Sequence, residues 1–221
     1  MWKIFKIRLY VRFAKTHFCI SNKFITFAVC LSSEFYFMDI QYLVRLEEKM
    51  QDEVLRLCTS RNALKGVLLS TEDIDEQWKI LAPEYMGDAV PEIANYPTVS
   101  VSWAAYLGLA VAYGWDADWE TYLKMPYQGY YGEQGFDDMD EHIVRDLLNM
   151  PLDSRSAKEL EETIRQCGEK LVALIRFEQV PPQSEMAFHV FSRACRVMFR
   201  TGAAIQLKRM GYNFEKVNLG N

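Results

Sequence analysis

The chain has 221 residues, of which 50% are hydrophobic and 14% aromatic, and its formal net charge is −5. This composition is typical of a globular protein and excludes an intrinsically disordered polymer. The negative balance argues against a general nucleic-acid binder, which needs a basic surface to displace counterions from phosphates.

Charge is distributed unevenly along the chain. Residues 1–37 hold six basic side chains and a single acid, so residues 38–221 carry a net charge of −10. Such an asymmetry indicates a segment with its own origin or role. We therefore expect residues 1–37 to be a basic N-terminal extension and residues 38–221 to be the folded domain.

Three interpretations of this extension stay open. The apolar stretch 24–31 behind basic residues is typical of a secretory or lipoprotein leader, although it is short for one. The alternating pattern of residues 6–13 suits a surface-binding or membrane-peripheral arm. We favour the third interpretation, in which Met38 is the native start. Met38 directly precedes a helical pattern, and the residues before it are of the types that AT-rich DNA encodes by chance.

From residue 38 onward, apolar residues recur at spacings of three and four. Asp39 is expected to cap a first helix that ends near Cys58. Thr71 belongs to a capping signal for a second helix, which Pro83 is expected to interrupt. Residues 99–115 then predict an apolar helix rich in small side chains, packed in the middle of a bundle. Its 17 residues lie at the lower limit for a membrane span, and we expect no span in the body.

The second half of the chain continues the helical pattern. Asp137 is expected to cap a helix over residues 139–149, and Ser156 opens a capping box for the next one. Pro181 and Pro182 precede a final helix over residues 184–210. The sequence therefore predicts an all-α protein, a single-domain bundle of about six or seven helices with a long Tyr/Gly-rich loop.

That loop, residues 125–135, contains one proline and three glycines and so cannot be a regular helix. Tyr127, Tyr130 and Tyr131 are candidates for the wall of a ligand pocket. The acids that follow, Asp137, Asp138, Asp140 and Glu141, are able to attract a cationic ligand or partner. The alternative is a surface loop whose tyrosines lie flat over the bundle, followed by acids that favour a helix N-terminus.

A stripe of charged residues follows one face of the predicted last helix: Glu185, His189, Arg193, Arg196 and Arg200. Arginine presents a planar fork that suits carboxylate or phosphate, so the stripe is a candidate site for an anion. His189 is the candidate acid or base. The alternative is that the arginines pair with Glu161, Glu162, Glu169 or other acids of the body.

Cysteines and histidines give no metal or cofactor signature. The five cysteines are odd in number and widely spaced, which favours reduced thiols and a cytoplasmic location, with secretion only if residues 1–37 are a real leader. His142 is expected to be a surface or interhelical histidine. We predict no metal site and no cofactor.

No motif in the chain identifies a biochemical function. The first hypothesis is a non-catalytic protein-interaction module, whose partner is another protein or a second copy of the chain, and not a nucleic acid. The alternative is a small-molecule binding protein or unfamiliar enzyme for an anionic ligand. Its pocket would lie between the Tyr127–Tyr131 loop and the Glu185–Arg200 helix face.

Overall fold

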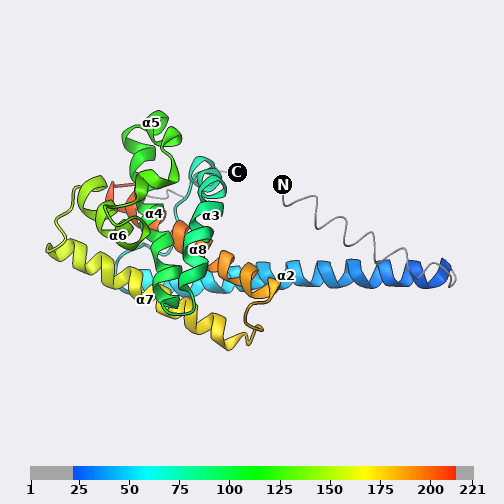
Figure 1. Ribbon diagram of the computed structural model, residues 1–221. Coiled ribbons are helices and arrows are strands. Elements are labelled where there is room, and N and C mark those ends of the chain that lie inside the picture. Colours follow the sequence, from blue (N-terminus) through cyan, green and yellow to red (C-terminus); the bar gives the residue numbers. More distant parts are fainter. Residues whose placement is uncertain (1–21, 213–221) are drawn as a thin grey trace, which may run out of the picture. The chain divides into compact units, whose positions relative to one another are not determined.

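The computed structural model describes the backbone of residues 22–212 and the side chains of residues 40–212. The chain divides into two units, residues 1–44 and residues 45–221. Throughout the described part every regular element is helical and none is a strand (Figure 1). The predicted all-α class, with about six or seven helices, is confirmed for these residues. The three interpretations of residues 1–37 fall largely outside the described residues and stay predictions.

Helix α2 (Asn22–Ser60) begins well before Asp39, so the expectation that Asp39 caps it is wrong. No proline or glycine occurs between residues 22 and 60, and nothing in that stretch ends a helix. In the part of α2 that belongs to the second unit, one stripe is buried at helical spacing: Leu46, Met50, Val54 and Cys58. Asn62 follows the helix with a positive φ of 58°, which closes its C-terminus.

Helix α3 (Glu72–Glu92) confirms one sequence prediction and corrects another. The Thr71 hydroxyl accepts a hydrogen bond from the Ile74 amide at 3.3 Å, as expected of an N-cap. However, the helix continues through Pro83 and Pro91. Pro83 lies on the exposed side of the helix, where a carbonyl that loses its intrahelical donor is open to solvent. Buried side chains on both sides of it, Trp78, Leu81 and Tyr85, hold the two halves on the same core.

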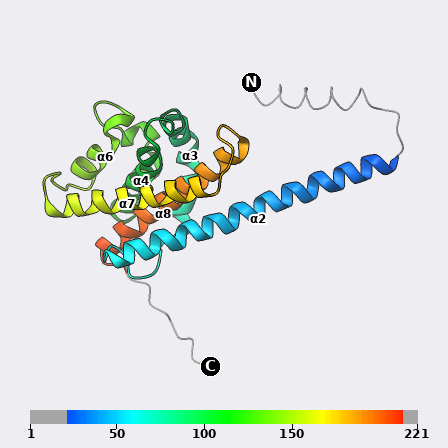
Figure 2. The same ribbon diagram turned by 90° about the horizontal axis from the view of Figure 1, so that it is seen from below.

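Helix α4 (Pro97–Ala117) is the central helix of the second unit, as its small residues predicted. In Figures 1 and 2 it lies among α3, α7 (Arg155–Phe177) and α8 (Glu185–Arg209), and it packs most extensively against α8. A Cβ added at Gly108 would lie 2.0 Å from the carbonyl oxygen of Phe199, and one at Gly202 would lie 1.9 Å from that of Ala105. The α4 and α8 backbones therefore touch where both helices lack a side chain.

Short elements connect α4 to α7: α5 (Trp119–Lys124), η1 (Tyr127–Tyr130), η2 (Phe136–Asp138), α6 (Met139–His142) and η3 (Ile143–Leu147). A helix begins at Met139 as predicted, but Asp137 is not its cap, and it changes to a π-helix at Ile143 instead of continuing regularly to residue 149. The Asp138 carboxylate instead accepts the Gln134 amide at 3.0 Å and closes the loop before α6. The chain then widens into a π-turn, in which Leu148 N–H donates to the Ile143 carbonyl at 2.9 Å. This turn includes Ile143 and Val144, adjacent residues that are both buried.

The last two long helices begin at serine caps. Ser154, rather than Ser156, caps α7 by accepting the Ala157 amide at 3.1 Å, because Ser154 has the extended backbone of a cap and Ser156 is already helical. Ser184 caps α8 in the same way at 3.0 Å, which confirms the predicted start. Gly211, at φ 96°, follows its end. Within residues 22–212, no helix is both long and apolar enough to cross a membrane.

Candidate functional site

The predicted charged stripe on α8 is engaged in ion pairs. Arg193 and Arg196 both contact the carboxylate of Glu47, which lies on α2 within the second unit and is buried. Arg200 donates to Asp75 of α3, with 2.8 Å between Nε and Oδ1. The arginines therefore pair with acids of the body, as the alternative interpretation held, although their partners are not the three glutamates it named. This pairing joins α8 to α2 and α3.

The ion pair between Asp75 and Arg200 keeps both side chains in their charged forms. Burial acts to raise the pKa of the Asp75 carboxyl, but the hydrogen bonds and charge of Arg200 outweigh it and hold the pKa below its usual range. The hydrogen bond from Arg200 also raises the pKa of that arginine. Both groups are thus fully ionised at neutral pH, and each neutralises the other.

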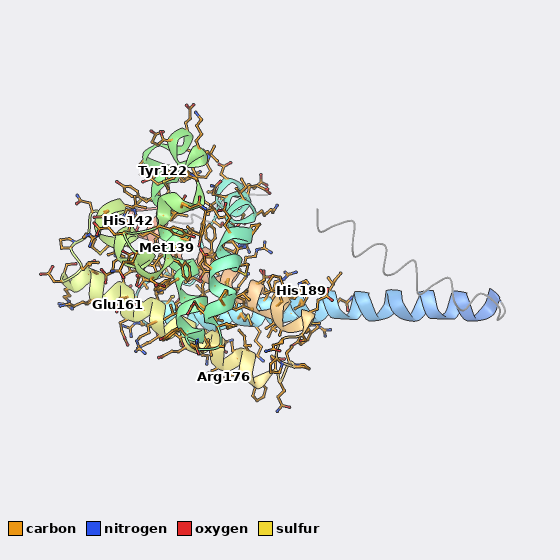
Figure 3. The ribbon with its side chains drawn as sticks, viewed as in Figure 1. Tyr122, Met139, His142, Glu161, Arg176 and His189 are labelled. Atoms are coloured by element: carbon orange, nitrogen blue, oxygen red, sulfur yellow. The ribbon has the colours of Figure 1, made fainter. Side chains whose placement is uncertain are left out.

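The two remaining members of the stripe are more open to solvent. His189 Nε2 lies 3.8 Å from Oε1 of Glu185, and about half of the histidine side chain is exposed. His142 pairs with Asp146, with 2.8 Å between Nδ1 and Oδ2. Figure 3 shows His142 and His189 well apart in the second unit, so the two histidines do not form one site.

The Tyr/Gly-rich loop is built into the fold. Tyr127 and Tyr130 are 1% and 0% exposed, so they do not lie flat over the surface. The Tyr131 hydroxyl donates to Asp88 of α3, and Gln128 Nε2 donates to Glu84 of α3 at 2.6 Å. Burial, followed by the bond to the Asp88 carboxylate, raises the pKa of Tyr131 to about 12. The loop is anchored to α3 by these contacts.

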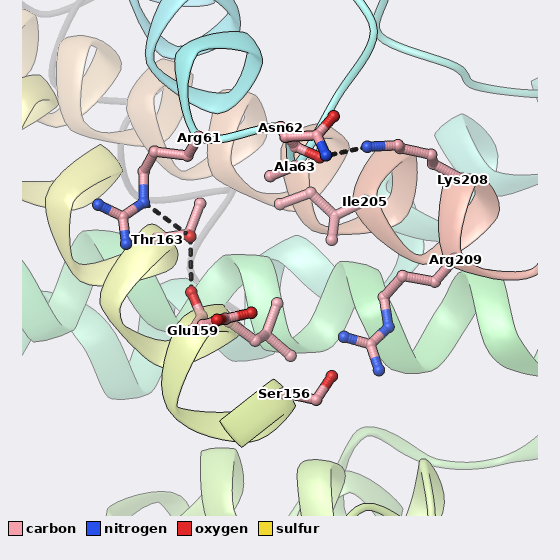
Figure 4. A pocket seen from close by; sticks show the side chains of 10 residues that line it. Arg61, Asn62, Ala63, Ser156, Glu159, Thr163, Ile205, Lys208 and Arg209 are labelled. Carbon is pink, nitrogen blue, oxygen red and sulfur yellow. Dashed lines mark hydrogen bonds between the residues drawn. The ribbon is translucent and has the colours of Figure 1, made fainter. Parts of the chain in front are cut away.

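A cavity of about 250 Å³ lies elsewhere in the second unit (Figure 4). Its wall comes from the turn after α2, the first turns of α7 and the end of α8. The lining residues are Arg61, Asn62, Ala63, Ser156, Glu159, Leu160, Thr163, Ile205, Lys208 and Arg209. None of the predicted site residues is among them, and the ligand-binding roles of those residues stay predictions.

Three cations line this cavity, and each is held by a neutral group. Arg61 Nε donates to the Thr163 hydroxyl at 3.0 Å, and its Nη1 donates to Gln166 at 3.0 Å. Lys208 Nζ donates to the backbone carbonyl of Asn62, as Figure 4 shows. Arg209 Nη2 lies 3.7 Å from the Met150 sulfur. Within the described residues, none of the three cations forms an ion pair with an acid.

Two further features make the cavity positive. Glu159, the one acid in its wall, is paired with Arg155 at 2.7 Å. The first turn of α7, with its positive dipole end, includes Ser156 of the wall. Arg209 is exposed overall, but partial desolvation of its guanidinium lowers its pKa, and the group stays charged because an arginine is not deprotonated in proteins. The arrangement suits an anion.

Sequence reasoning missed this cluster. Arg61 follows the end of a helix, and Lys208 and Arg209 are the basic residues expected in the last turn of another. No motif connects positions so far apart in the chain, and only the fold brings them together. Among the described side chains, no group of three His, Cys, Asp or Glu residues is placed to hold a metal ion.

Comparison with known proteins does not assign the chain to a family. No protein-family model, no curated protein and no solved structure matches the chain.

Proposed function

We propose that this protein binds a small anionic ligand, one that carries a phosphate or carboxylate group, in the cavity lined by Arg61, Lys208 and Arg209. The observation that carries the proposal is the convergence of three cations without acidic partners in a domain with a net charge of −10. Charges on a folded protein are usually paired or solvated, and a cluster of like charges is unfavourable unless an opposite charge joins it. The missing opposite charge is the ligand.

The cavity also sets the size of the ligand. Its volume of about 250 Å³ is below the roughly 300–1,000 Å³ of pockets for drug-sized molecules. Arginine offers planar pairs of N–H donors and lysine a point charge, a combination that suits a phosphate or carboxylate oxygen cluster. The ligand class agrees with the second of the two sequence hypotheses, although the pocket is at a different place from the one that hypothesis named.

Thermal unfolding in sodium phosphate and in sodium chloride of equal ionic strength tests the proposal. A ligand that binds only the folded state raises the melting temperature, and we expect phosphate to do so beyond chloride. Arg209→Gln and Lys208→Gln should abolish the difference. The matched control is Arg165→Gln, because Arg165 pairs with Glu162 and Glu169 on the surface of α7 and is not part of the cavity wall.

Identical melting curves in the two salts would contradict the proposal. So would a phosphate-dependent increase that survives in both cavity variants.

A protein-interaction role is the second candidate, and one observation favours it. Phe177, at the end of α7, is 76% exposed, and Phe188, near the start of α8, is 46% exposed. Large exposed aromatic side chains are enriched at protein interfaces. The Tyr loop does not supply this surface, because Tyr127 and Tyr130 are buried. Sedimentation of the native protein and of Phe177→Ser at increasing concentration tests for self-association through this end.

A further inference from the structure

Two buried thiols face each other between α2 and α7. The sulfur atoms of Cys58 and Cys167 lie 3.5 Å apart, and both side chains are 0% exposed. They come from positions 109 residues apart, so only the packing of the last turn of α2 on α7 brings them together. A third buried cysteine, Cys195, has a different environment, with its sulfur 3.7 Å from the carbonyl oxygen of Ser100.

The two thiols of the pair are not equivalent. A hydrogen bond from Cys167 favours the thiolate of Cys58 and lowers its pKa; burial opposes this shift, and the nearby charge of Arg61 supports it. The hydrogen bond with Cys58, together with burial, raises the pKa of Cys167. A thiolate is the nucleophilic form of cysteine, so Cys58 is the reactive partner and Cys167 the second thiol in reach.

We infer that Cys58 and Cys167 are a redox modification site that forms an intramolecular disulfide with a hydroperoxide. The Cys58 thiolate attacks one peroxide oxygen, the O–O bond breaks, and Cys58 becomes a sulfenic acid while hydroxide leaves. Cys167 then attacks the Cys58 sulfur, the S–O bond breaks, and the S–S bond forms as a second hydroxide leaves. With the two thiol protons, the products are one disulfide and two waters for each hydrogen peroxide. The thiols are oxidised and the peroxide is reduced.

The surroundings of the pair permit this step. A disulfide needs the sulfurs about 2.05 Å apart, so they must approach by roughly 1.5 Å from where they lie. Cys58 is in the last turn of α2, and helix ends open more readily than helix centres. Arg61 and Thr163, one turn from each cysteine, line the cavity described above, which offers a peroxide molecule a place close to the pair. Cys195 has no second thiol in contact and cannot complete the reaction within the described residues.

Peptide mapping by mass spectrometry, after the native full-length protein is treated with hydrogen peroxide and its remaining thiols are blocked, tests the inference. We expect a linked peptide that contains Cys58 and Cys167, lacks two hydrogen atoms, and disappears on reduction with dithiothreitol. The measurement needs no variant and is independent of anion binding, so it stands or falls separately from the proposed function.

Two variants sharpen the result. In Cys167→Ala, Cys58 should stop at the sulfenic acid and be trapped by dimedone. In the matched control Cys195→Ala, which also removes one buried thiol, the linked peptide should form as in the native protein. The inference is overturned if Cys58 and Cys167 of the treated native protein both remain free thiols. It is also overturned if Cys58 is oxidised without any link to Cys167.

Discussion

Helix α8 carries two groups of cationic side chains. They differ in whether they form ion pairs with acidic side chains of the protein. Arg193 and Arg196 share the carboxylate of Glu47, and Arg200 pairs with Asp75, so each of the three has an acidic partner within the fold. Lys208 and Arg209, near the C-terminal end of the same helix, contact a carbonyl and a thioether and border a cavity with Arg61. The first group stabilises the packing of helices, and the second is the group that we propose binds an anionic ligand.

The comparison teaches that residue type alone does not identify a binding site. The arginine stripe, with its regular helical spacing, is the more visible pattern in the sequence, yet in the structure its arginines form ion pairs with acids of neighbouring helices. The less regular cluster has the electrostatic character of a site, because its charges have not been cancelled. Four substitutions follow, from the largest expected effect to the smallest; three test this division, and Asp140→Asn tests the opposite case of a buried acid without a cation.

Replacing Glu47 with Gln should be the most damaging of the four. It removes the acid that two arginines share at a buried position, and breaking a buried pair costs roughly 3–5 kcal/mol. Both arginine side chains are about one-third exposed, so water compensates in part and we expect a loss of about 2–3 kcal/mol in the free energy of unfolding. Urea unfolding measures it.

The control for this change is Glu76→Gln, which breaks an exposed pair with Lys79 and should alter stability little. If the two variants lose the same free energy of unfolding, the Glu47 ion pairs contribute no more to stability than an exposed pair does.

Replacing Asp140 with Asn should stabilise the protein. Burial raises the pKa of Asp140 to about 6, and this carboxyl forms no ion pair within the described residues. Because the folded pKa is above the unfolded one, ionising Asp140 works against folding, and this cost appears as the pH rises from about 4 to 6. Asparagine avoids it. We expect the variant to gain about 1–2 kcal/mol near pH 7 and almost nothing near pH 4.

Thermal unfolding of both proteins across this pH range measures the difference. Asp146→Asn is the contrasting case. Hydrogen bonds from Arg145 and His142 lower the pKa of Asp146 to about 2. The ionised Asp146 carboxylate therefore stabilises the folded protein, and this stabilisation is lost as the pH falls toward 2.

Replacing Arg209 with Gln should separate binding from stability. No acid is left unpaired, so we expect a change below about 0.5 kcal/mol in the free energy of unfolding in chloride. The response to phosphate should nevertheless disappear. A loss of stability in chloride as large as that of Glu47→Gln would place Arg209 among the structural cations.

Replacing His189 with Ala should have the smallest effect. The side chain is half exposed, and its partner Glu185 is 90% exposed at 3.8 Å, so the pair is solvated. We expect no measurable change in melting temperature in either salt. A phosphate response that weakens in this variant would restore the α8 stripe as a ligand site.

The fold was largely predictable, because local patterns encode it. The small residues of α4 predicted a central helix, and Thr71 and Ser184 predicted two helix starts. Predictions that rested on one residue were less secure: Pro83 does not end α3, since burial on both sides of it outweighs the lost hydrogen bond.

The candidate site was not predictable in the same way. Its cations come from the ends of two helices that are distant in the sequence, and no periodicity relates them. These cations are distinguished by the lack of an acidic partner. This lack can be recognised only when the ion pairs of the other charged residues are known from the structure. The Tyr loop gives the reverse case: an unusual composition predicted a pocket wall, and in the structure Gln128 and Tyr131 anchor the loop to α3.

The backbone contact at Gly108 and Gly202 also constrains how the protein is made. Helix α4 is synthesised well before α8, and at typical elongation rates of about 5–20 residues per second the ribosome needs several seconds to add the residues between them. During that interval the apolar face that α4 later presents to α8 has no α8 to cover it. A nascent chain arrested before residue 185 should therefore recruit chaperones, and the full chain released from the ribosome should no longer bind them.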